Sequence, residues 1–275
     1  MTVLEAILFG LAQGLTEFIP ISSTAHMVIL GYMLEVPTPG LTFEIFLHLA
    51  SLLAVLIYFR KDLSQLAAGS WRSLQAGATP ADLTDRRMVI YLLVATVITG
   101  GLGLFLMESL GDSIKSPTLV GGALLVTATL LVVVERAKRL GDREPKDLRM
   151  LDAVLIGLAQ TAAVIPGVSR SGSTLIAGLA LGLNRETAVR FSFLLSIPVL
   201  AGSSILAFKD IAAGDLDAIS PLALGVSFLV SFLASIASIV WLIRMLKQQR
   251  LYWFSVYLVL MAIYVFVAFP PDSTF

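Results

Sequence analysis

Long apolar segments with few charges limit what this chain can fold into. They occupy residues 88–107 and 119–134 in the first half, and 187–208, 221–243 and 251–269 in the second. Each is close to the roughly 20 residues that a helix needs to cross a bilayer. Charged residues make up 14% of the chain, compared with about 25% in ordinary soluble domains. The sequence therefore predicts an all-α polytopic membrane protein.

Shorter apolar segments complete the first half. Residues 2–18 form a helix at the short limit for a span, and a second short helix runs to about residue 34 after a break at Pro20. Residues 43–59 form a third apolar helix, and the polar stretch 60–87 holds a surface helix over residues 63–74. The segment before Pro20 has no basic residues and is interrupted by Glu5 and Glu17, so we do not expect a signal peptide.

The composition excludes several kinds of site. The chain has no cysteine, which rules out disulfides and zinc sites of the cysteine type. The formal net charge of zero gives no information about nucleic acids, and no nucleic-acid partner is expected for a membrane protein of this kind. The partner expected from the composition is the lipid bilayer.

The chain contains an internal duplication. The sequence Gly-Leu-Ala-Gln at residues 10–13 recurs at 157–160, and an Ile-Pro pair followed by a hydroxyl-rich loop occurs in both halves. This predicts a single membrane domain, residues 1–275, built from repeats at approximately 1–134 and 151–270, with a charged linker at 135–150. Each repeat holds a broken, re-entrant helix pair plus three transmembrane helices. Because that number of crossings is odd, the two repeats are expected to be inverted.

The basic residues predict the orientation. Fifteen of the 19 Lys and Arg residues fall in loops on one side of this arrangement, and two, Lys115 and Lys209, fall on the other. The side rich in basic residues is normally cytoplasmic. The linker is therefore expected inside and both termini outside, with the two hydroxyl-rich loops meeting near the middle of the membrane.

The loop at residues 166–174 has the composition of an anion site. Pro166 ends one helix, two glycines permit a tight turn, and the hydroxyl residues can cap a new helix that starts near Gly172. A helix N-terminus beside a guanidinium is suited to phosphate. The candidate phosphate-binding residues are Gly167, Ser169, Arg170, Ser171, Ser173 and Thr174.

The first break carries candidate catalytic residues. Gln13 and Glu17 lie four residues apart on one helix face and offer oxygens to a divalent cation, Mg²⁺ or Ca²⁺. Ser23 and His26 lie three apart at the start of the next helix, where a hydroxyl and an imidazole can act as nucleophile and base. Ionisable groups in apolar segments, such as Arg170, are expensive and usually functional.

Structural roles are the alternatives for these residues. Glu17 can cap a helix or simply pair with Arg170, His26 can be a packed histidine, and Ser23 can be a helix cap. Glu44, His48 and Arg190 occupy matching positions in the two halves, and the interpretation that we favour for them is structural pairing near the membrane faces.

These motifs resemble those of the bacterial undecaprenyl-pyrophosphate phosphatases of the bacitracin-resistance type. The resemblance covers Gln13-x-x-x-Glu17, residues 20–26 and residues 166–174, and extends over essentially the whole chain. It implies metal-dependent hydrolysis of a polyprenyl pyrophosphate lipid to the monophosphate that is reused in peptidoglycan synthesis. The site would face outward from the bacterial plasma membrane.

By position, the resemblance places Gln13 and Glu17 on the metal-binding motif and Ser23 and His26 on the catalytic pair. It places Ser169, Arg170 and Thr174 on the phosphate loop. Because position 13 is a glutamine, the motif here supplies one carboxylate.

Two other functional classes fit the same pattern. Inverted repeats with broken helices are typical of secondary transporters, so a transporter or flippase for a prenyl phosphate or another anion is the main alternative. A purely structural bundle is the third. The sequence leaves open whether Ser23 or water is the nucleophile, and whether the protein is a monomer or a homodimer.

Overall fold

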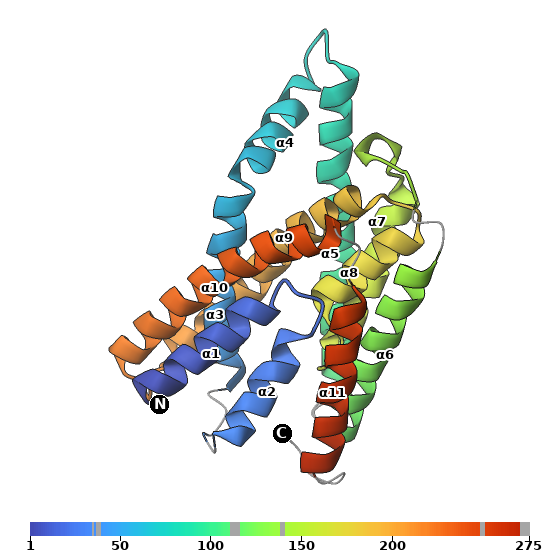
Figure 1. Ribbon diagram of the computed structural model, residues 1–275. Coiled ribbons are helices and arrows are strands. Elements are labelled where there is room, and N and C mark those ends of the chain that lie inside the picture. The colour runs from blue at the N-terminus through green and yellow to red at the C-terminus, as the bar shows by residue number, and fades with distance from the viewer. Residues whose placement is uncertain (35, 37–39, 111–115, 138–140, 248–250, 270–275) are drawn as a thin grey trace.

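The computed structural model describes residues 1–34, 36, 40–110, 116–137, 141–247 and 251–269. Within these ranges the regular structure is helical apart from an isolated bridge between Arg143 and Leu183, which confirms the all-α prediction. Figure 1 shows the helices in chain order: α1 (Val3–Thr16), α2 (Ser23–Met33), α3 (Gly40–Tyr58), α4 (Arg60–Arg72), α5 (Pro80–Leu110), α6 (Pro117–Arg136), the 3₁₀ helices η2 (Pro145–Asp147) and η3 (Ala162–Val164) on either side of α7 (Met150–Thr161), α8 (Arg170–Ala180), α9 (Arg185–Ala212), α10 (Pro221–Lys247) and α11 (Tyr252–Ala268).

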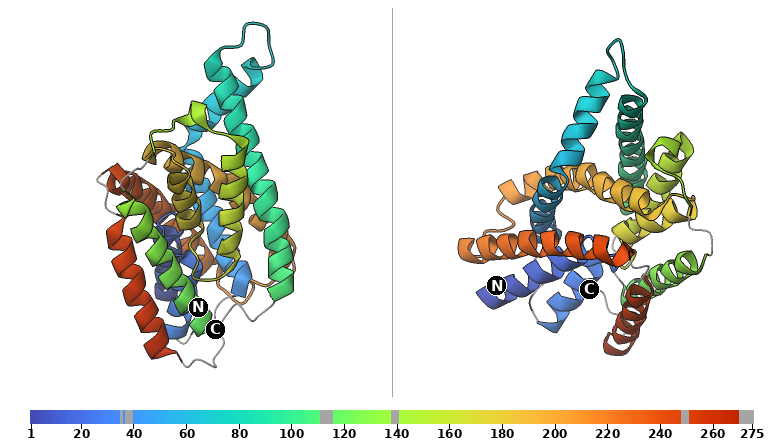
Figure 2. Two further views of the ribbon diagram at one scale, coloured as in Figure 1. Left: turned by 90° about the vertical axis from the view of Figure 1, so that its right-hand side faces the viewer. Right: turned by 45° about the horizontal axis from the view of Figure 1, so that its top comes forward.

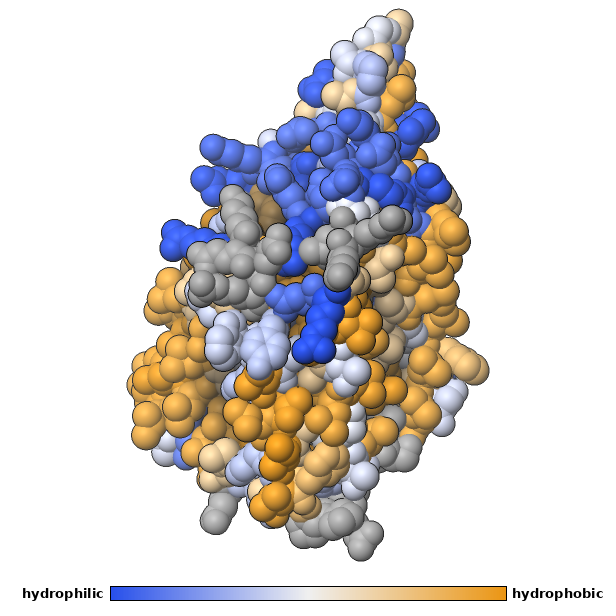
Figure 3. All heavy atoms as spheres, turned by 45° about the vertical axis from the view of Figure 1, so that its right-hand side comes forward, coloured by the Kyte–Doolittle hydropathy of each residue, from blue (hydrophilic) through white to orange (hydrophobic). Residues whose placement is uncertain are grey.

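Four of the described helices, α5, α6, α9 and α10, are long and apolar enough to cross a membrane. Helices α3 and α4 pass the same test together but are bent by 68° between them. The surface of the molecule agrees, because Figure 3 shows an apolar belt below a strongly hydrophilic zone. Large apolar side chains on this surface include Val97, Ile205 and Val267, each more than 70% exposed. Such a surface belongs in lipid, and the chain is a multi-pass membrane protein.

The helix expected at residues 63–74 exists as α4, but it does not lie flat on a surface. It packs along α5, with Leu66 of α4 and Met88 of α5 in the same buried cluster, and the two form a hairpin that projects from the bundle (Figure 1). At 31 residues, α5 is about 46 Å long, which exceeds the roughly 30 Å of bilayer hydrocarbon. Helix α5 is therefore long enough for its charged first turns, which include Arg86 and Arg87, to extend beyond the apolar layer.

Helices α1 and α7 are too short to cross a membrane. They have 14 and 12 residues, or about 20 Å of helix each, so each ends inside the protein. Pro20 and Pro166 follow these ends, and the turns beyond them contain positive φ angles, 68° at Ser22 and 100° at Gly167. A side chain on Gly167 would lie 2.6 Å from the carbonyl oxygen of Val120, so both the turn and the packing require glycine there.

Each broken pair folds back on itself. Helix α2 runs back toward the end of the molecule where α1 begins (Figure 1). For α7 and α8 the return is fixed by hydrogen bonds: Arg143, just before η2, pairs through its backbone with Gly182 and Asn184, just after α8. The described end of α11 and the start of α1 both lie at the end of the molecule opposite the α4–α5 hairpin (Figures 1 and 2).

Two pairs of helices cross at very close range. Helix α1 packs on α10 and α7 packs on α5. A Cβ atom added to Gly10 would lie 2.6 Å from the Ser227 carbonyl oxygen, and one added to Gly157 would lie 2.9 Å from that of Ala95. Gly10 and Gly157 begin the two copies of the repeated Gly-Leu-Ala-Gln sequence. The repeated glycines therefore allow the backbones to approach, as small residues do at helix interfaces in membranes.

Candidate active site

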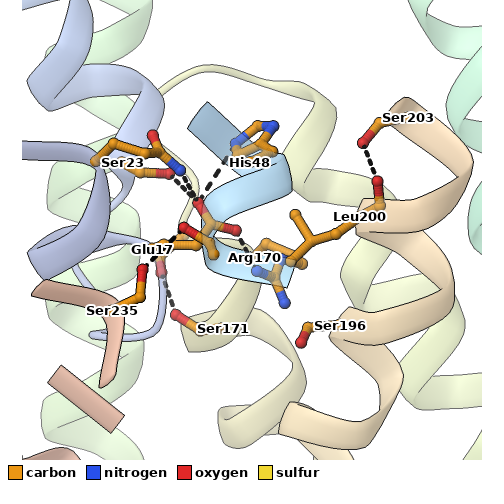
Figure 4. A network of polar contacts seen from close by, with 12 residues as sticks. Glu17, Ser23, His48, Arg170, Ser171, Ser196, Leu200, Ser203 and Ser235 are labelled. Atoms are coloured by element: carbon orange, nitrogen blue, oxygen red, sulfur yellow. Dashed lines mark hydrogen bonds and ion pairs between the residues drawn. The ribbon is translucent and has the colours of Figure 1, made fainter. Parts of the chain in front are cut away.

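Glu17 is the centre of a buried polar network at the end of α1 (Figure 4). Its side chain is 4% exposed. Oε2 accepts hydrogen bonds from Gln13 Nε2 at 2.8 Å and Ser23 Oγ at 2.7 Å, and His48 Nε2 lies 3.4 Å from the same oxygen. Oε1 accepts a hydrogen bond from Arg170 Nη2. The two breaks of the chain are thus joined by one carboxylate.

This arrangement offsets the burial of a carboxylate. Moving an ionised carboxyl group out of water is costly unless it is paired and fully hydrogen-bonded. The chain supplies an amide, a hydroxyl, an imidazole and a guanidinium to Glu17 from four different segments. Arg170 is the first residue of α8, whereas the sequence predicted a helix start near Gly172. Its guanidinium therefore projects from the helix N-terminus itself.

A pocket of about 220 Å³ opens beside this network, which is smaller than the roughly 300–1,000 Å³ of most small-ligand sites. Both halves of the chain line it. The first half contributes polar residues, and the second half contributes Arg170, three other polar residues and an apolar wall. The lining residues are Glu17, Ser22, Ser23, Thr24, His48, Thr99, Gln160, Ala163, Val164, Val168, Ser169, Arg170, Val199, Leu200 and Ser203.

The hydroxyl groups of the second loop are mostly engaged inside the protein. Ser169 is the N-cap of α8 and accepts from the Gly172 N–H at 3.1 Å. Ser171 donates to the Ile19 carbonyl oxygen, and Ser173 donates to the Ser169 carbonyl oxygen.

Thr174 Oγ1 lies 2.5 Å from Ser192 Oγ. Of the six candidate phosphate-binding residues, the structure places Ser169 and Arg170 on the pocket, whereas Gly167, Ser171, Ser173 and Thr174 are not among its lining residues.

The hydrogen bonds described for His26 do not go to Ser23. Its Nδ1 lies 2.7 Å from the Ser22 carbonyl oxygen and its Nε2 lies 2.6 Å from the Tyr257 hydroxyl, with the two rings stacked. Because a carbonyl can only accept, Nδ1 carries the proton, and in the neutral ring Nε2 accepts from Tyr257. The Ser23 hydroxyl instead donates to Glu17. The predicted nucleophile–base pair is therefore not assembled by these contacts.

His48 is the site residue that sequence reasoning missed. The favoured interpretation was structural pairing near a membrane face, but the structure places His48 on the pocket wall against Glu17. Its counterpart Arg190 does pair structurally, with Asp62 at 2.7 Å. The spacing of Glu44 and His48, four residues apart in an apolar helix, was the signal that could have identified it.

The cation-binding potential of the site rests on oxygen atoms. In the part of the chain that the structure describes, no group of three or more His, Cys, Asp or Glu side chains is suitably placed to hold a metal ion. Gln13 Oε1, however, is buried and has no hydrogen-bond partner there. An amide oxygen of this kind next to the Glu17 carboxylate is a ligand type that hard divalent cations accept.

Fold and site together define the class of protein: a polytopic helical membrane protein with a buried carboxylate–guanidinium site between two broken helices. The family described as bacitracin resistance protein BacA matches residues 6–264. The chain belongs to this family.

Individual relatives extend this match over the whole chain. Undecaprenyl-diphosphatase 2 of Halalkalibacterium halodurans is 47% identical over 275 residues, covering 100% of this chain and 99% of the relative. Undecaprenyl-diphosphatase 1 of Shouchella clausii is 44% identical over 268 residues, covering 97% of this chain and 96% of the relative. The undecaprenyl-diphosphatase of Myxococcus xanthus is 41% identical over 267 residues, covering 97% and 89%.

Proposed function

We propose that this protein hydrolyses undecaprenyl pyrophosphate to undecaprenyl phosphate and inorganic phosphate. The family match and the names of its relatives support this activity, and so does the site. The observation that carries the proposal is the meeting of Glu17 and Arg170, from opposite halves of the chain, at a pocket beside an apolar wall. The monophosphate returns to peptidoglycan synthesis, and this recycling accounts for bacitracin resistance in the family.

The geometry suggests a division of roles. Arg170 has further N–H groups beyond the one bonded to Glu17, and they can bind oxygens of the terminal phosphate as charge develops in the transition state. Ser23 donates to Glu17, so Glu17 is placed to accept the Ser23 proton if that hydroxyl attacks phosphorus. The P–O bond to the lipid phosphate then breaks, and water releases phosphate from the phosphoserine. If water attacks directly, Glu17 accepts its proton instead.

We further propose that a divalent cation, Mg²⁺ or Ca²⁺, is held by Glu17 and by Gln13 Oε1. The unpartnered, buried Oε1 atom supports this assignment. When bound, the cation neutralises charge on the pyrophosphate oxygens. In the Gln13→Glu variant, a second carboxylate replaces an amide that donates to Glu17. We expect each cation to raise the midpoint of thermal unfolding more in Gln13→Glu than in wild type. This measurement does not depend on turnover. An equal rise in the two proteins would argue against cation binding at position 13.

The arrangement of contacts supports two inverted repeats, approximately residues 1–134 and 151–270. In this correspondence, helices α1, α3, α5 and α6 of the first repeat are equivalent to α7, α9, α10 and α11 of the second. The contact of α1 with α10 is then equivalent to the contact of α7 with α5. The contacts of α3 with α9 and of α6 with α11 each join two equivalent helices. Hydrogen bonds follow the same exchange. Ser238 donates to the Gly14 carbonyl oxygen and Thr99 donates to that of Gly157.

The proposed orientation places the linker, residues 135–150, in the cytoplasm; its residues 138–140 are outside the described residues. Both termini then lie outside the cell, and the pocket faces the outer side of the bacterial plasma membrane. The chain has no cysteine, so a single introduced cysteine is the one labelling site of the purified variant after whole cells have been treated. An impermeant reagent should label a cysteine at Ala213, in the α9–α10 connection, and not one at Asp142. The reverse pattern would invert the proposed orientation.

The activity is tested with protein purified in detergent micelles, undecaprenyl pyrophosphate and a divalent cation. Release of inorganic phosphate is expected from wild type and not from Glu17→Gln. A transporter or flippase requires two compartments, whereas hydrolysis does not. Wild-type protein that is folded and yet releases no phosphate under these conditions would exclude the proposed function.

A further inference from the structure

One face of α3 meets the catalytic network without a role in the mechanism described above. Glu44 and His48 lie four residues apart, on the same side of the helix. His48 Nε2 is 3.4 Å from Glu17 Oε2, and Glu44 Oε1 accepts a hydrogen bond of 2.7 Å from Thr24 Oγ1. Thr24 follows Ser23 in the first turn of α2. The same face of α3 therefore contacts both the carboxylate and the segment that carries the hydroxyl.

We propose that His48 is a positioning residue for Glu17. Through Nε2 it keeps Oε2 of the carboxylate directed at the Ser23 hydroxyl while Oε1 remains on Arg170. Glu44, through Thr24, holds the start of α2 against the same helix. The proposal rests on the proposed function, because it concerns the group that accepts a proton during hydrolysis.

The two oxygens of the Glu17 carboxylate make different contacts, so the orientation of the carboxylate matters. Gln13, Ser23 and His48 all lie at Oε2, whereas Arg170 lies at Oε1. Rotation about the terminal bond of Glu17 would exchange the two oxygens. The Gln13 amide comes from the same helix as Glu17, one turn earlier, and moves with it. The other two contacts of Oε2 come from different helices: Ser23, the hydroxyl that would react, belongs to α2, and His48 belongs to α3. His48 is therefore the contact that can hold this oxygen in place without itself reacting.

In the described part of the second half, the residue that corresponds to His48 makes no such contact with the site. Arg190, at the position that corresponds to His48, pairs with Asp62, and neither is among the residues that line the pocket. The contact of α3 with the site is therefore not required by the repeated architecture. It is a feature of the first half, where the carboxylate lies.

Three substitutions at one position separate the possible roles of His48. In His48→Gln, the amide nitrogen can occupy the place of Nε2. In His48→Asn, the amide nitrogen can occupy the place of Nδ1. His48→Leu removes both nitrogen atoms. Loss of a hydrogen bond to a charged group corresponds to roughly tenfold to a hundredfold in rate when it acts in the transition state. We expect His48→Leu and His48→Asn to lower kcat by at least about tenfold with KM within about twofold, and His48→Gln to retain kcat within about threefold.

Phosphate release and thermal unfolding are measured on the same preparations. Arg190→Gln is the matched control, since it changes the corresponding position away from the pocket, and its kcat should equal that of wild type. Thr24→Val, which removes the hydrogen bond to Glu44, should lower kcat about threefold without raising KM.

Several results would overturn the proposal. The first is normal turnover in His48→Leu. The second is a His48→Gln protein that unfolds like wild type but turns over as slowly as His48→Leu. The third is normal turnover in His48→Asn but not in His48→Gln, which would assign the role to Nδ1. If His48→Leu does not fold, the comparison of the Gln and Asn variants still decides. Failure of the proposed function is distinct, because wild type itself would then release no phosphate.

Discussion

The two broken helices share a backbone plan but differ in what their side chains do. At the first break, Glu17 and Ser23 face each other beside the pocket, and the turn contains a strained serine, Ser22, with a positive φ. At the second break the positive φ falls on a glycine, Gly167, which adopts it without strain, and most hydroxyl groups bond to the protein itself. Backbone strain of this kind tends to persist at functional sites.

The difference indicates how a duplicated framework acquires one active site. In the proposed mechanism the first half supplies the groups that accept or donate protons, and the second half supplies one cation, Arg170, at a helix N-terminus. Neither half holds a complete site. The hydrogen bond between Arg170 and Glu17 joins them, so the activity depends on how the halves are packed as well as on each loop.

The largest effect is expected from Glu17→Gln. Loss of the carboxylate that contacts both Ser23 and Arg170 should reduce turnover by roughly a thousandfold, the upper range for one transition-state electrostatic contact. Phosphate release by purified protein measures it. Thr161→Val, a change at the second break that leaves the pocket intact, is the control and should turn over normally. Metal-dependent turnover of Glu17→Gln within about tenfold of wild type would contradict the assignment of the chemistry to the first break.

Arg170→Lys comes next and tests the contribution of the second break. We expect a loss of about a hundredfold, close to that of Arg170→Ala, because lysine keeps the charge but lacks the planar fork that can hold Glu17 and a phosphate oxygen together. Rates of phosphate release from the two variants are compared directly. Near-normal activity with lysine would make Arg170 a counter-ion of Glu17 and nothing more.

Sequence reasoning predicted the framework well because the framework depends on local rules. Apolar length, the two prolines and the repeated Gly-Leu-Ala-Gln sequence identify the helices and the breaks without knowledge of their packing. The start of α8 was misplaced by two residues, because Ser169 rather than a later residue provides the cap.

The site was predicted only in part, because its decisive contacts join distant segments. Spacing placed Gln13 beside Glu17, and the structure agrees. Spacing could not show that Ser23 bonds to Glu17 while His26 turns toward Tyr257, 231 residues away in the chain. For the same reason it could not place His48 at the site, since only the packing of α3 against the first break brings His48 to Glu17.

A smaller effect is expected at His26, and it tests whether the first break contains a second proton acceptor. The structure gives His26 Nδ1 a hydrogen bond to the Ser22 carbonyl oxygen, which supports the turn just before Ser23. His26→Ala should lower turnover about tenfold, the equivalent of one lost hydrogen bond, whereas His26→Asn, whose amide can replace Nδ1, should retain most of it. Tyr257→Phe should have little effect. An asparagine variant that is stable but as slow as the alanine variant would instead support His26 as a base acting through Nε2.

The smallest effect is expected from Thr174→Val at the second break, where it separates phosphate binding from internal support. Thr174 Oγ1 is buried, lies 2.5 Å from Ser192 Oγ and is also within hydrogen-bond distance of the Arg170 and Ser171 carbonyl oxygens. Valine has nearly the same shape, so the variant should lose about 1 kcal/mol of stability, or about 2–4 °C in the midpoint of thermal unfolding. Turnover per folded molecule should not change, because this hydroxyl has no place on the pocket. A tenfold loss of turnover with an unchanged unfolding midpoint would mean that the second loop binds phosphate through Thr174, and that the two breaks are more alike in function than their contacts indicate.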